Sequence, residues 1–428
     1  MVSKKSAAVS LAGPDDIHRE TLPNGITVLS RANFNSPSVV MSGYLASGSL
    51  FESDEKLGLA DFVFSALMRG TAKRDMQAIY DALESAGAGF GYDSGTYTSG
   101  FSGRALAEDL PLLLDVLSET IQFPTFPTEQ IERLRAQMLT ALAIRAQDTS
   151  DMADLIFNEM LFEGHPYARP DDGWPETVRS ITREDMQDFH KRTIGPRGMV
   201  IAIVGAVDPQ RAVETAQRAL GAWTNPAQEE RPAIPEQSAP AQTKKRVHQI
   251  AGKSQSDLVI GTIGPHRKDE DFMAASLGNS VLGQFGMMGR IGDVVREKSG
   301  LAYYASSSLN AGTGPGPGSW EVSAGVNPLN VQKAVDLIVA ELRRFVQKGV
   351  AAQELADSQD NYVGRLPLSL ESNGGVAGAL LNIERFDLGL DYYRRYDGLV
   401  RGVTRAQVRA AAEKFIDADR LAIAVAGP

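Results

Sequence analysis

The chain has 428 residues, of which 43% are hydrophobic and 22% charged, a composition typical of a globular protein with more than one core. The net charge of −10 and the lack of a basic cluster argue against nucleic acid as a partner, and no apolar run is long enough to span a membrane. The chain has no cysteine, which excludes disulfides, thiolate zinc sites and a cysteine nucleophile.

Residues 1–15 are small and polar, and we expect them to be flexible. They contain no apolar stretch of the kind that a signal peptide needs, although a chain that begins after a removed signal would look the same. The compartment therefore stays open between the cytoplasm and the periplasm.

The first half of the chain alternates irregularly between strand-like and helix-like segments. Strand-like composition marks Ile26–Ser30, Val39–Leu45 and Tyr92–Phe101. An apolar helical pattern covers Leu112–Phe123, and a polar helix begins after a short turn, near Glu129.

The second half repeats this pattern. Thr182 and Thr404, which are 222 positions apart, each stand as the N-cap of a helix that is followed by an apolar strand, Met199–Gly205 or Leu421–Gly427. Phe123 and Phe345 end two similar apolar helices at the same spacing, and polar helices follow near Glu129 and Glu354. Two correspondences at one spacing indicate an internal duplication.

A segment rich in Pro, Ala, Gln and charge, Asn225–Lys245, separates the halves and is typical of an extended linker. We therefore predict one domain over residues 16–224 and a homologous domain over 246–428. The mixture of elements predicts an α+β fold, in which each domain is a mostly antiparallel sheet with helices packed on one face.

Five segments together resemble one known family: Leu22–Val28, Ala46–Glu52, Gly58–Thr71, Phe162–Pro166 and Val295–Tyr303. Their order and spacing are similar to those of the pitrilysin, insulinase and mitochondrial processing peptidase family of zinc metallopeptidases. The resemblance covers nearly the whole chain. It implies two α+β domains per chain, which form half of a clamshell.

The zinc-binding positions of that family are altered here. Its active members carry His-x-x-Glu-His on a helix, where two histidines bind zinc and the glutamate activates water. The matching positions are Asp61, Phe64 and Ser65, and the later glutamate ligand matches Ala141. Positions i, i+3 and i+4 share one helix face, but a carboxylate, a phenyl ring and a hydroxyl cannot supply three zinc ligands. The resemblance therefore implies a degenerate metal site, with no metal bound by this chain.

A second family motif is retained. Val295–Tyr303 reads VREKSGLAY, similar to the family pattern LRE-x-x-G-L-A-Y, whose Arg and Tyr hold the substrate backbone and the carbonyl under attack. The matching residues are Arg296 and Tyr303. Guanidinium and phenol donors suit the negative oxygen of a tetrahedral intermediate. The structural alternative is an Arg296 paired with Glu297 or Asp293, and a half-buried strand tyrosine.

These features support two functions. The first is a metal-free, non-catalytic subunit of a heterodimeric zinc metallopeptidase, whose homologous partner carries the intact His-x-x-Glu-His and the zinc while this chain offers Arg296 and Tyr303 to a peptide substrate. The second is an inert scaffold subunit of a larger complex, like the core proteins of respiratory complexes. No Ser-His-Asp order or GxSxG motif supports a self-sufficient hydrolase.

Overall fold

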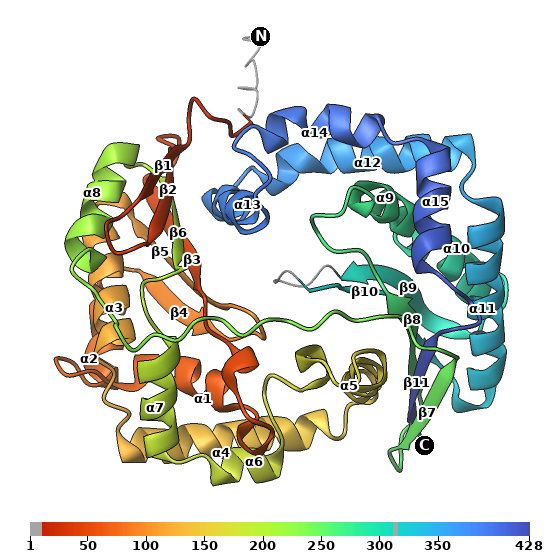
Figure 1. The fold of residues 1–428 in the computed structure, drawn as a ribbon, viewed down its shortest axis with the longest axis horizontal. Coiled ribbons are helices and arrows are strands. Elements are labelled where there is room, and N and C mark those ends of the chain that lie inside the picture. Colours follow the sequence, from red (N-terminus) through yellow and green to blue (C-terminus); the bar gives the residue numbers. More distant parts are fainter. Residues whose placement is uncertain (1–10, 311–315) are drawn as a thin grey trace. The chain divides into compact units, whose positions relative to one another are not determined.

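Two compact units make up the fold, and neither is a continuous stretch of chain. The computed structural model describes residues 11–310 and 316–428 (Figure 1). Unit 1 consists of Met1–Ala136, Glu176–Pro232 and Val363–Asp397, and unit 2 of Gln137–Pro175, Ala233–Tyr362 and Gly398–Pro428. The domain bounds predicted from the sequence, 16–224 and 246–428, divide the chain into its two repeated halves and remain a prediction. The compact units are a different division, because each contains segments from both halves.

The described residues of unit 1 form a six-stranded sheet in the order β1-β2-β6-β3-β5-β4. All neighbouring strands are antiparallel except β2 and β6. Its strands are β1 (His18–Thr21), β2 (Thr27–Ala32), β3 (Ser38–Leu45), β4 (Gly89–Asp93), β5 (Ser99–Leu106) and β6 (Val200–Gly205). Its helices are α1 (Leu59–Ala66), α2 (Met76–Ser85), α3 (Leu110–Gln122), α6 (Pro175–Ser180), α7 (Arg183–Thr193), α8 (Pro209–Leu220) and α13 (Asn373–Phe386).

Unit 2 contains a five-stranded sheet in the order β7-β11-β8-β10-β9, in which only β7 and β11 are parallel. Its strands are β7 (Lys244–Gln249), β8 (Ser256–Ile263), β9 (Ala302–Asn310), β10 (Ser319–Val326) and β11 (Ala422–Gly427). Its helices are α5 (Thr149–Leu161), α9 (Phe272–Gly283), α10 (Phe285–Gly292), the π-helical turn η6 (Asp293–Glu297), α11 (Val331–Lys348) and α15 (Arg405–Phe415). Helices α4 (Thr128–Arg145), α12 (Ala352–Ser369) and α14 (Tyr392–Arg401) run across the division, and α6 begins one residue before it.

The two sheets have the same order of equivalent strands, as the internal repeat predicts. Strands β2, β6, β3, β5 and β4 of unit 1 correspond in order to β7, β11, β8, β10 and β9 of unit 2. The repeated caps also form as predicted, because Thr182 and Thr404 each make a capping box at the start of α7 and α15. The mostly antiparallel α+β architecture is confirmed.

Helices cover both faces of each sheet, not only the one face that the sequence predicts. Every residue of β6, β8 and β11 is buried, so the central strands have no solvated face. In unit 1, α3 and α8 pack on one side, and α13 packs on β3 and β6 through a cluster that contains Leu380 and Ile383 (Figure 1). In unit 2, α5 covers β8 and β11 in the same way.

Two local predictions differ from the structure. The strand predicted over Tyr92–Phe101 is two strands, because residues 94–98 form a connection between β4 and β5 that bends at Thr96 and Tyr97. The predicted linker ends two residues earlier, since β7 begins at Lys244. Of the N-terminal segment predicted to be flexible, residues 1–10 lie outside the described residues, and Ala12 is fully buried in the core.

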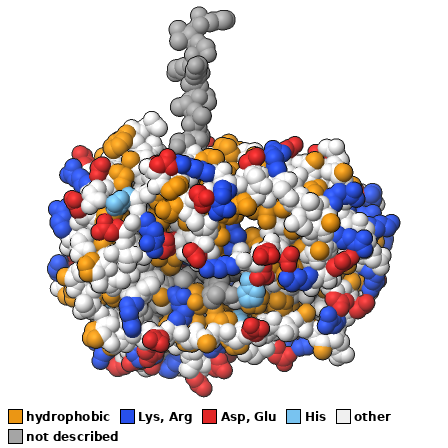
Figure 2. Space-filling view, turned by 45° about the horizontal axis from the view of Figure 1, so that its top comes forward, with side chains coloured by type: hydrophobic (Ala, Val, Ile, Leu, Met, Phe, Trp, Pro, Cys, Tyr) orange, Lys and Arg blue, Asp and Glu red, His pale blue; other side chains and the backbone are white. Residues whose placement is uncertain are grey.

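Within the described part of the chain, no helix is long and apolar enough to cross a bilayer. On the face that Figure 2 shows, basic and acidic side chains are interspersed, and no broad basic field of the kind that binds nucleic acid is visible there.

The matched caps give a stability prediction. Thr404→Ala and Thr182→Ala each remove a side-chain acceptor for a backbone N–H, from Gln407 at 3.3 Å and from Asp185 at 3.1 Å. We expect each change to lower the free energy of unfolding by about 1 kcal/mol. Urea denaturation measures this. Thr404→Ser keeps the acceptor and is the control, so an equal loss in that variant would contradict the capping role.

Candidate functional site

Helix α1 carries three of the positions that match the family's metal site, and Glu52 fixes its start. The helix begins after Gly58, whose φ of 91° lies in the left-handed region that glycine adopts without strain. The buried Glu52 carboxylate accepts hydrogen bonds from the backbone N–H groups of Gly58, at 3.1 Å, and Ala60, at 2.5 Å. A carboxylate at a helix N-terminus satisfies free donors and complements the helix dipole. The frame of the helix is therefore well supported.

The side chains on this helix do not form a metal-binding face. Asp61 is half-buried and Ser65 is exposed, whereas the ring of Phe64 is 1% exposed and lies 6.3 Å from the ring of Tyr92. Tyr92 is half-buried, its hydroxyl is 2.6 Å from that of Thr120, and the removal of water around that hydroxyl strongly raises its pKa. The position of the family's general base is thus part of an aromatic core.

The fourth position, Ala141, is exposed on α4, in the part of that helix that belongs to unit 2. It offers a methyl group where the family has a carboxylate. Within residues 11–310 and 316–428, no group of three His, Cys, Asp or Glu residues is arranged to hold a metal ion. Because zinc requires three protein ligands, the donor set Asp61, Phe64, Ser65 and Ala141 does not fit it.

Two histidines have structural surroundings. His190 of α7 has its Nε2 atom 2.7 Å from the carbonyl oxygen of Ile121, and its ring lies edge-on to that of Phe126. His165 Nδ1 accepts a hydrogen bond from the backbone N–H of Tyr167 at 3.1 Å. Burial lowers the pKa of both imidazoles, which keeps them neutral.

Arg296 and Tyr303 lie at either end of the short connection between η6 and β9. The connection is held by backbone hydrogen bonds from Gly300 N to Arg296 O, at 2.8 Å, and from Leu301 N to Val295 O, at 3.0 Å. Arg296 belongs to the π-helical turn, a form that is frequent at functional sites. Its guanidinium is 3.6 Å from the Glu297 carboxylate, and 34% of its side chain stays exposed. The predicted pairing with Glu297 is therefore present but leaves the cation accessible.

Tyr303 is 77% exposed, not half-buried as the structural alternative expects. It lies on β9, which is an edge strand. Ala302 pairs with Val326 and Tyr304 with Gly325, so Tyr303 is the extra residue of a β-bulge. Bulges redirect side chains and are common beside active sites. The bulge therefore presents the Tyr303 phenol to solvent.

A polar cluster behind this strand escapes prediction. The Tyr304 hydroxyl donates to Asp257 at 2.7 Å, and Thr149 of α5 donates to the same buried carboxylate at 2.5 Å. The side chain of Asp154 on α5 is exposed at its edge, but most of the carboxyl group is surrounded by protein. This desolvation, together with the negative charge of Glu321 and other nearby carboxylates, raises the pKa of Asp154 to about 7. The sequence offered one indication of this cluster: Asp257 is an acidic residue within a mostly apolar strand.

Two family models match the chain: Insulinase (Peptidase family M16) over residues 27–170, and Peptidase M16 inactive domain over residues 180–362. The chain is 27% identical over 429 residues to an uncharacterized zinc protease of Streptomyces coelicolor, with 97% of this chain and 90% of that protein covered. It is also 27% identical over 268 residues to mitochondrial cytochrome b-c1 complex subunit 1 of Bos taurus, with 62% and 55% covered.

Among solved structures, a peptidase M16 inactive domain from Pseudomonas fluorescens matches with a TM-score of 0.89 and 26% identity, over 96% of this chain and 98% of that one. The match spans both compact units of the fold.

The position of Phe64 leads to a test of the degenerate site. Phe64→Glu restores the family residue but places an unpaired carboxylate among buried rings, and we expect the free energy of unfolding to fall by about 3 kcal/mol or more. Ser65→His is the control, because its side chain is exposed and the change should cost less than about 0.5 kcal/mol. Urea denaturation compares the two. Equal stability of the two variants would contradict the core role of Phe64.

The position of Asp154 leads to a pH prediction. Its folded-state pKa of about 7 exceeds the ordinary value of 3.8. Between pH 4 and pH 7 the carboxyl group is therefore protonated in the folded state but ionised in the unfolded state. The contribution of Asp154 to the free energy of unfolding should fall as pH rises from about 4 to about 7. Asp154→Asn removes this loss, and we expect its melting temperature to exceed that of the parent by more at pH 8 than at pH 5. The same difference at both pH values would contradict the prediction.

Proposed function

Because the chain belongs to the M16 peptidase family, we propose that it is the metal-free subunit of a two-chain zinc peptidase. A homologous partner chain carries His-x-x-Glu-His and its zinc, and this chain supplies Arg296 and Tyr303 to the bound peptide. Hydrolysis of a peptide bond then requires both chains, and neither cleaves peptides alone.

The observation that carries this proposal is the contrast between the two sets of residues. At the metal positions, Phe64 is packed into the core and Ala141 has no donor atom. At the second motif, Arg296 and Tyr303 have accessible polar groups, and a bulge presents the tyrosine. The contrast favours a chain that has given up metal binding but still contacts a ligand.

The chemistry of the two side chains suits the attacked carbonyl of a peptide. As water adds to the carbonyl carbon, negative charge develops on its oxygen, and donors already in place stabilise that charge. Arg296 has planar N–H donors that match a carbonyl or carboxylate, and the Tyr303 phenol offers one O–H donor. Neither group has to move a proton, so both are assigned to binding and orientation.

A second function, an inert scaffold, is favoured by a separate observation. The chain is similar to mitochondrial cytochrome b-c1 complex subunit 1, a component of a respiratory complex. In that case Arg296 and Tyr303 have no substrate, and their replacement changes no turnover. The accessible pair leads us to favour the peptidase subunit.

The experiment is to purify this chain and the homologous chain with intact His-x-x-Glu-His from the same organism, and to mix them. We expect hydrolysis of a quenched fluorescent peptide only in the mixture. Arg296→Ala and Tyr303→Phe should each lower kcat/KM by about a hundredfold, since each removes one donor to the developing oxyanion. Lys298→Ala, an exposed cation between the two residues, is the matched control and should leave kcat/KM nearly unchanged.

Assembly must be measured beside activity, because a variant that fails to associate would also lose turnover. Analytical ultracentrifugation should give the same complex for the parent and all three variants. Full turnover with Arg296→Ala and Tyr303→Phe in an intact complex would contradict the proposed roles and favour the scaffold.

A further inference from the structure

Two arginines lie near one end of the sheet of unit 1, each stacked on a tyrosine. Arg385 of α13 has its Cζ atom 4.3 Å from the centre of the Tyr44 ring on β3. Arg231, in the irregular segment after α8, has its Cζ atom 3.8 Å from the centre of the Tyr97 ring in the β4–β5 turn. Burial lowers the pKa of Arg385, and the charge of Arg231 adds a smaller effect in the same direction, so the two guanidinium groups are near each other. Like charges are therefore held together.

The protein neutralises these cations only in part. Among the described residues, neither arginine forms an ion pair, and the Nε–H groups of both are buried without an acceptor. Asp93 of β4 is the carboxylate whose charge acts on Arg385. Within the cluster of Arg231, Arg385 and Asp93, two guanidinium groups and one carboxylate leave one excess positive charge. Buried donors without acceptors and uncompensated like charges are both unfavourable, and such exceptions in a folded protein often mark a binding site.

The strand register places this cluster beside an open part of the sheet. Tyr44, Gly100 and Asp93 lie side by side on β3, β5 and β4, and so point to the same face. Further along the same face of β4 come Gly91 and Gly89, and a Cβ atom built on either would have no neighbour within 4 Å. Since α13 covers β3 and β6, the face of the edge strand β4 stays open beside the arginines.

We propose that Arg231 and Arg385 bind a carboxylate of an extended peptide whose backbone lies over the open face of β4. That the ligand is a peptide rests on the proposed function. That it carries a carboxylate is inferred from the charge of the arginine cluster alone. A carboxylate balances the single excess charge, whereas a phosphate dianion exceeds it. Stacked arginines are pre-organised for such recognition, because the planar fork can donate two parallel hydrogen bonds. The site thus selects acidic peptides.

The test measures binding to this chain alone, without the partner. The probes are fluorescein-labelled ten-residue peptides with amidated C-termini, in which one Glu moves along a Ser/Ala background, and the matching Gln peptides. We expect at least one Glu peptide to bind about tenfold or more tightly than its Gln form at 50 mM salt, because a charge-assisted pair is lost in the Gln form. Fluorescence anisotropy gives the Kd values.

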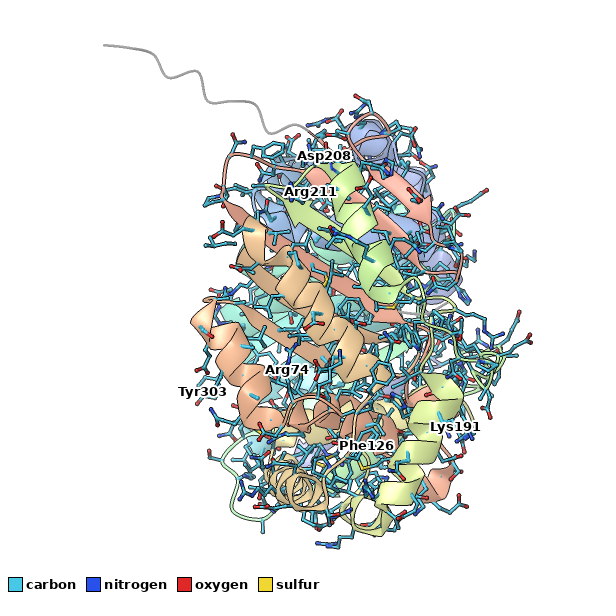
Figure 3. The ribbon with its side chains drawn as sticks, turned by 90° about the vertical axis from the view of Figure 1, so that its left-hand side faces the viewer. Arg74, Phe126, Lys191, Asp208, Arg211 and Tyr303 are labelled. Carbon is cyan, nitrogen blue, oxygen red and sulfur yellow. The ribbon has the colours of Figure 1, made fainter. Side chains whose placement is uncertain are left out.

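Variants locate the preference for Glu. Arg231→Gln and Arg385→Gln should each reduce it, and the double variant should abolish it. Arg211→Gln, on the exposed surface of α8, should retain it in full (Figure 3). Arg231 lies outside any helix or strand, so its replacement does not break one, and Arg385→Lys keeps the charge if Arg385→Gln proves unstable. Acetate should compete with the Glu peptide at lower concentration than inorganic phosphate does.

Three results would overturn the inference: equal Kd values for Glu and Gln peptides at every position, a Glu preference that survives in the double variant, or stronger competition by phosphate than by acetate. The experiments can contradict the acidic-peptide site and the proposed peptidase function independently of each other. A Glu preference without turnover in the mixture leaves the binding site standing, and turnover without a Glu preference leaves the peptidase subunit standing.

Discussion

The burial of the central strands on both faces is the constraint on which the rest of the structure depends. Strands β6 and β11 consist of apolar residues and glycine, and all of them are buried. Each sheet therefore needs a helix layer on both sides. The second layer is α13 in unit 1 and α5 in unit 2, and each of these helices comes from the other half of the sequence. The exchanged helices explain why the compact units are discontinuous.

The same helices determine what remains accessible. Because α13 covers β3 and β6, the face of β4 stays uncovered, and because α5 covers β8 and β11, the face of β9 and β10 is only half-buried. Two residues with donor groups lie near these uncovered edges: the half-buried Arg385, stacked on Tyr44 in unit 1, and the exposed Tyr303 on β9 in unit 2. The centre of each sheet is therefore fully buried, and the side chains that we propose to contact a ligand lie near one edge of each sheet.

Features encoded locally were predictable from the sequence. The N-caps Thr182 and Thr404 and the apolar strands after them lie where the patterns place them, because a cap and a buried strand depend on adjacent residues. Other features depend on contacts far apart in sequence. Three features depend on separate segments of the chain: the exchange of α5 and α13, the bulge at Tyr303, and the proximity of Arg231 to Arg385. The residue pattern of a single segment cannot predict them.

The central claim is that metal binding and substrate contact are divided between two chains. Zinc content measured by inductively coupled plasma mass spectrometry on the purified chain, the homologous chain and their complex tests it most directly. The account predicts no zinc in this chain alone and one zinc per complex of two chains. Stoichiometric zinc in this chain alone, or the absence of any complex with the zinc-binding homologue, would contradict it.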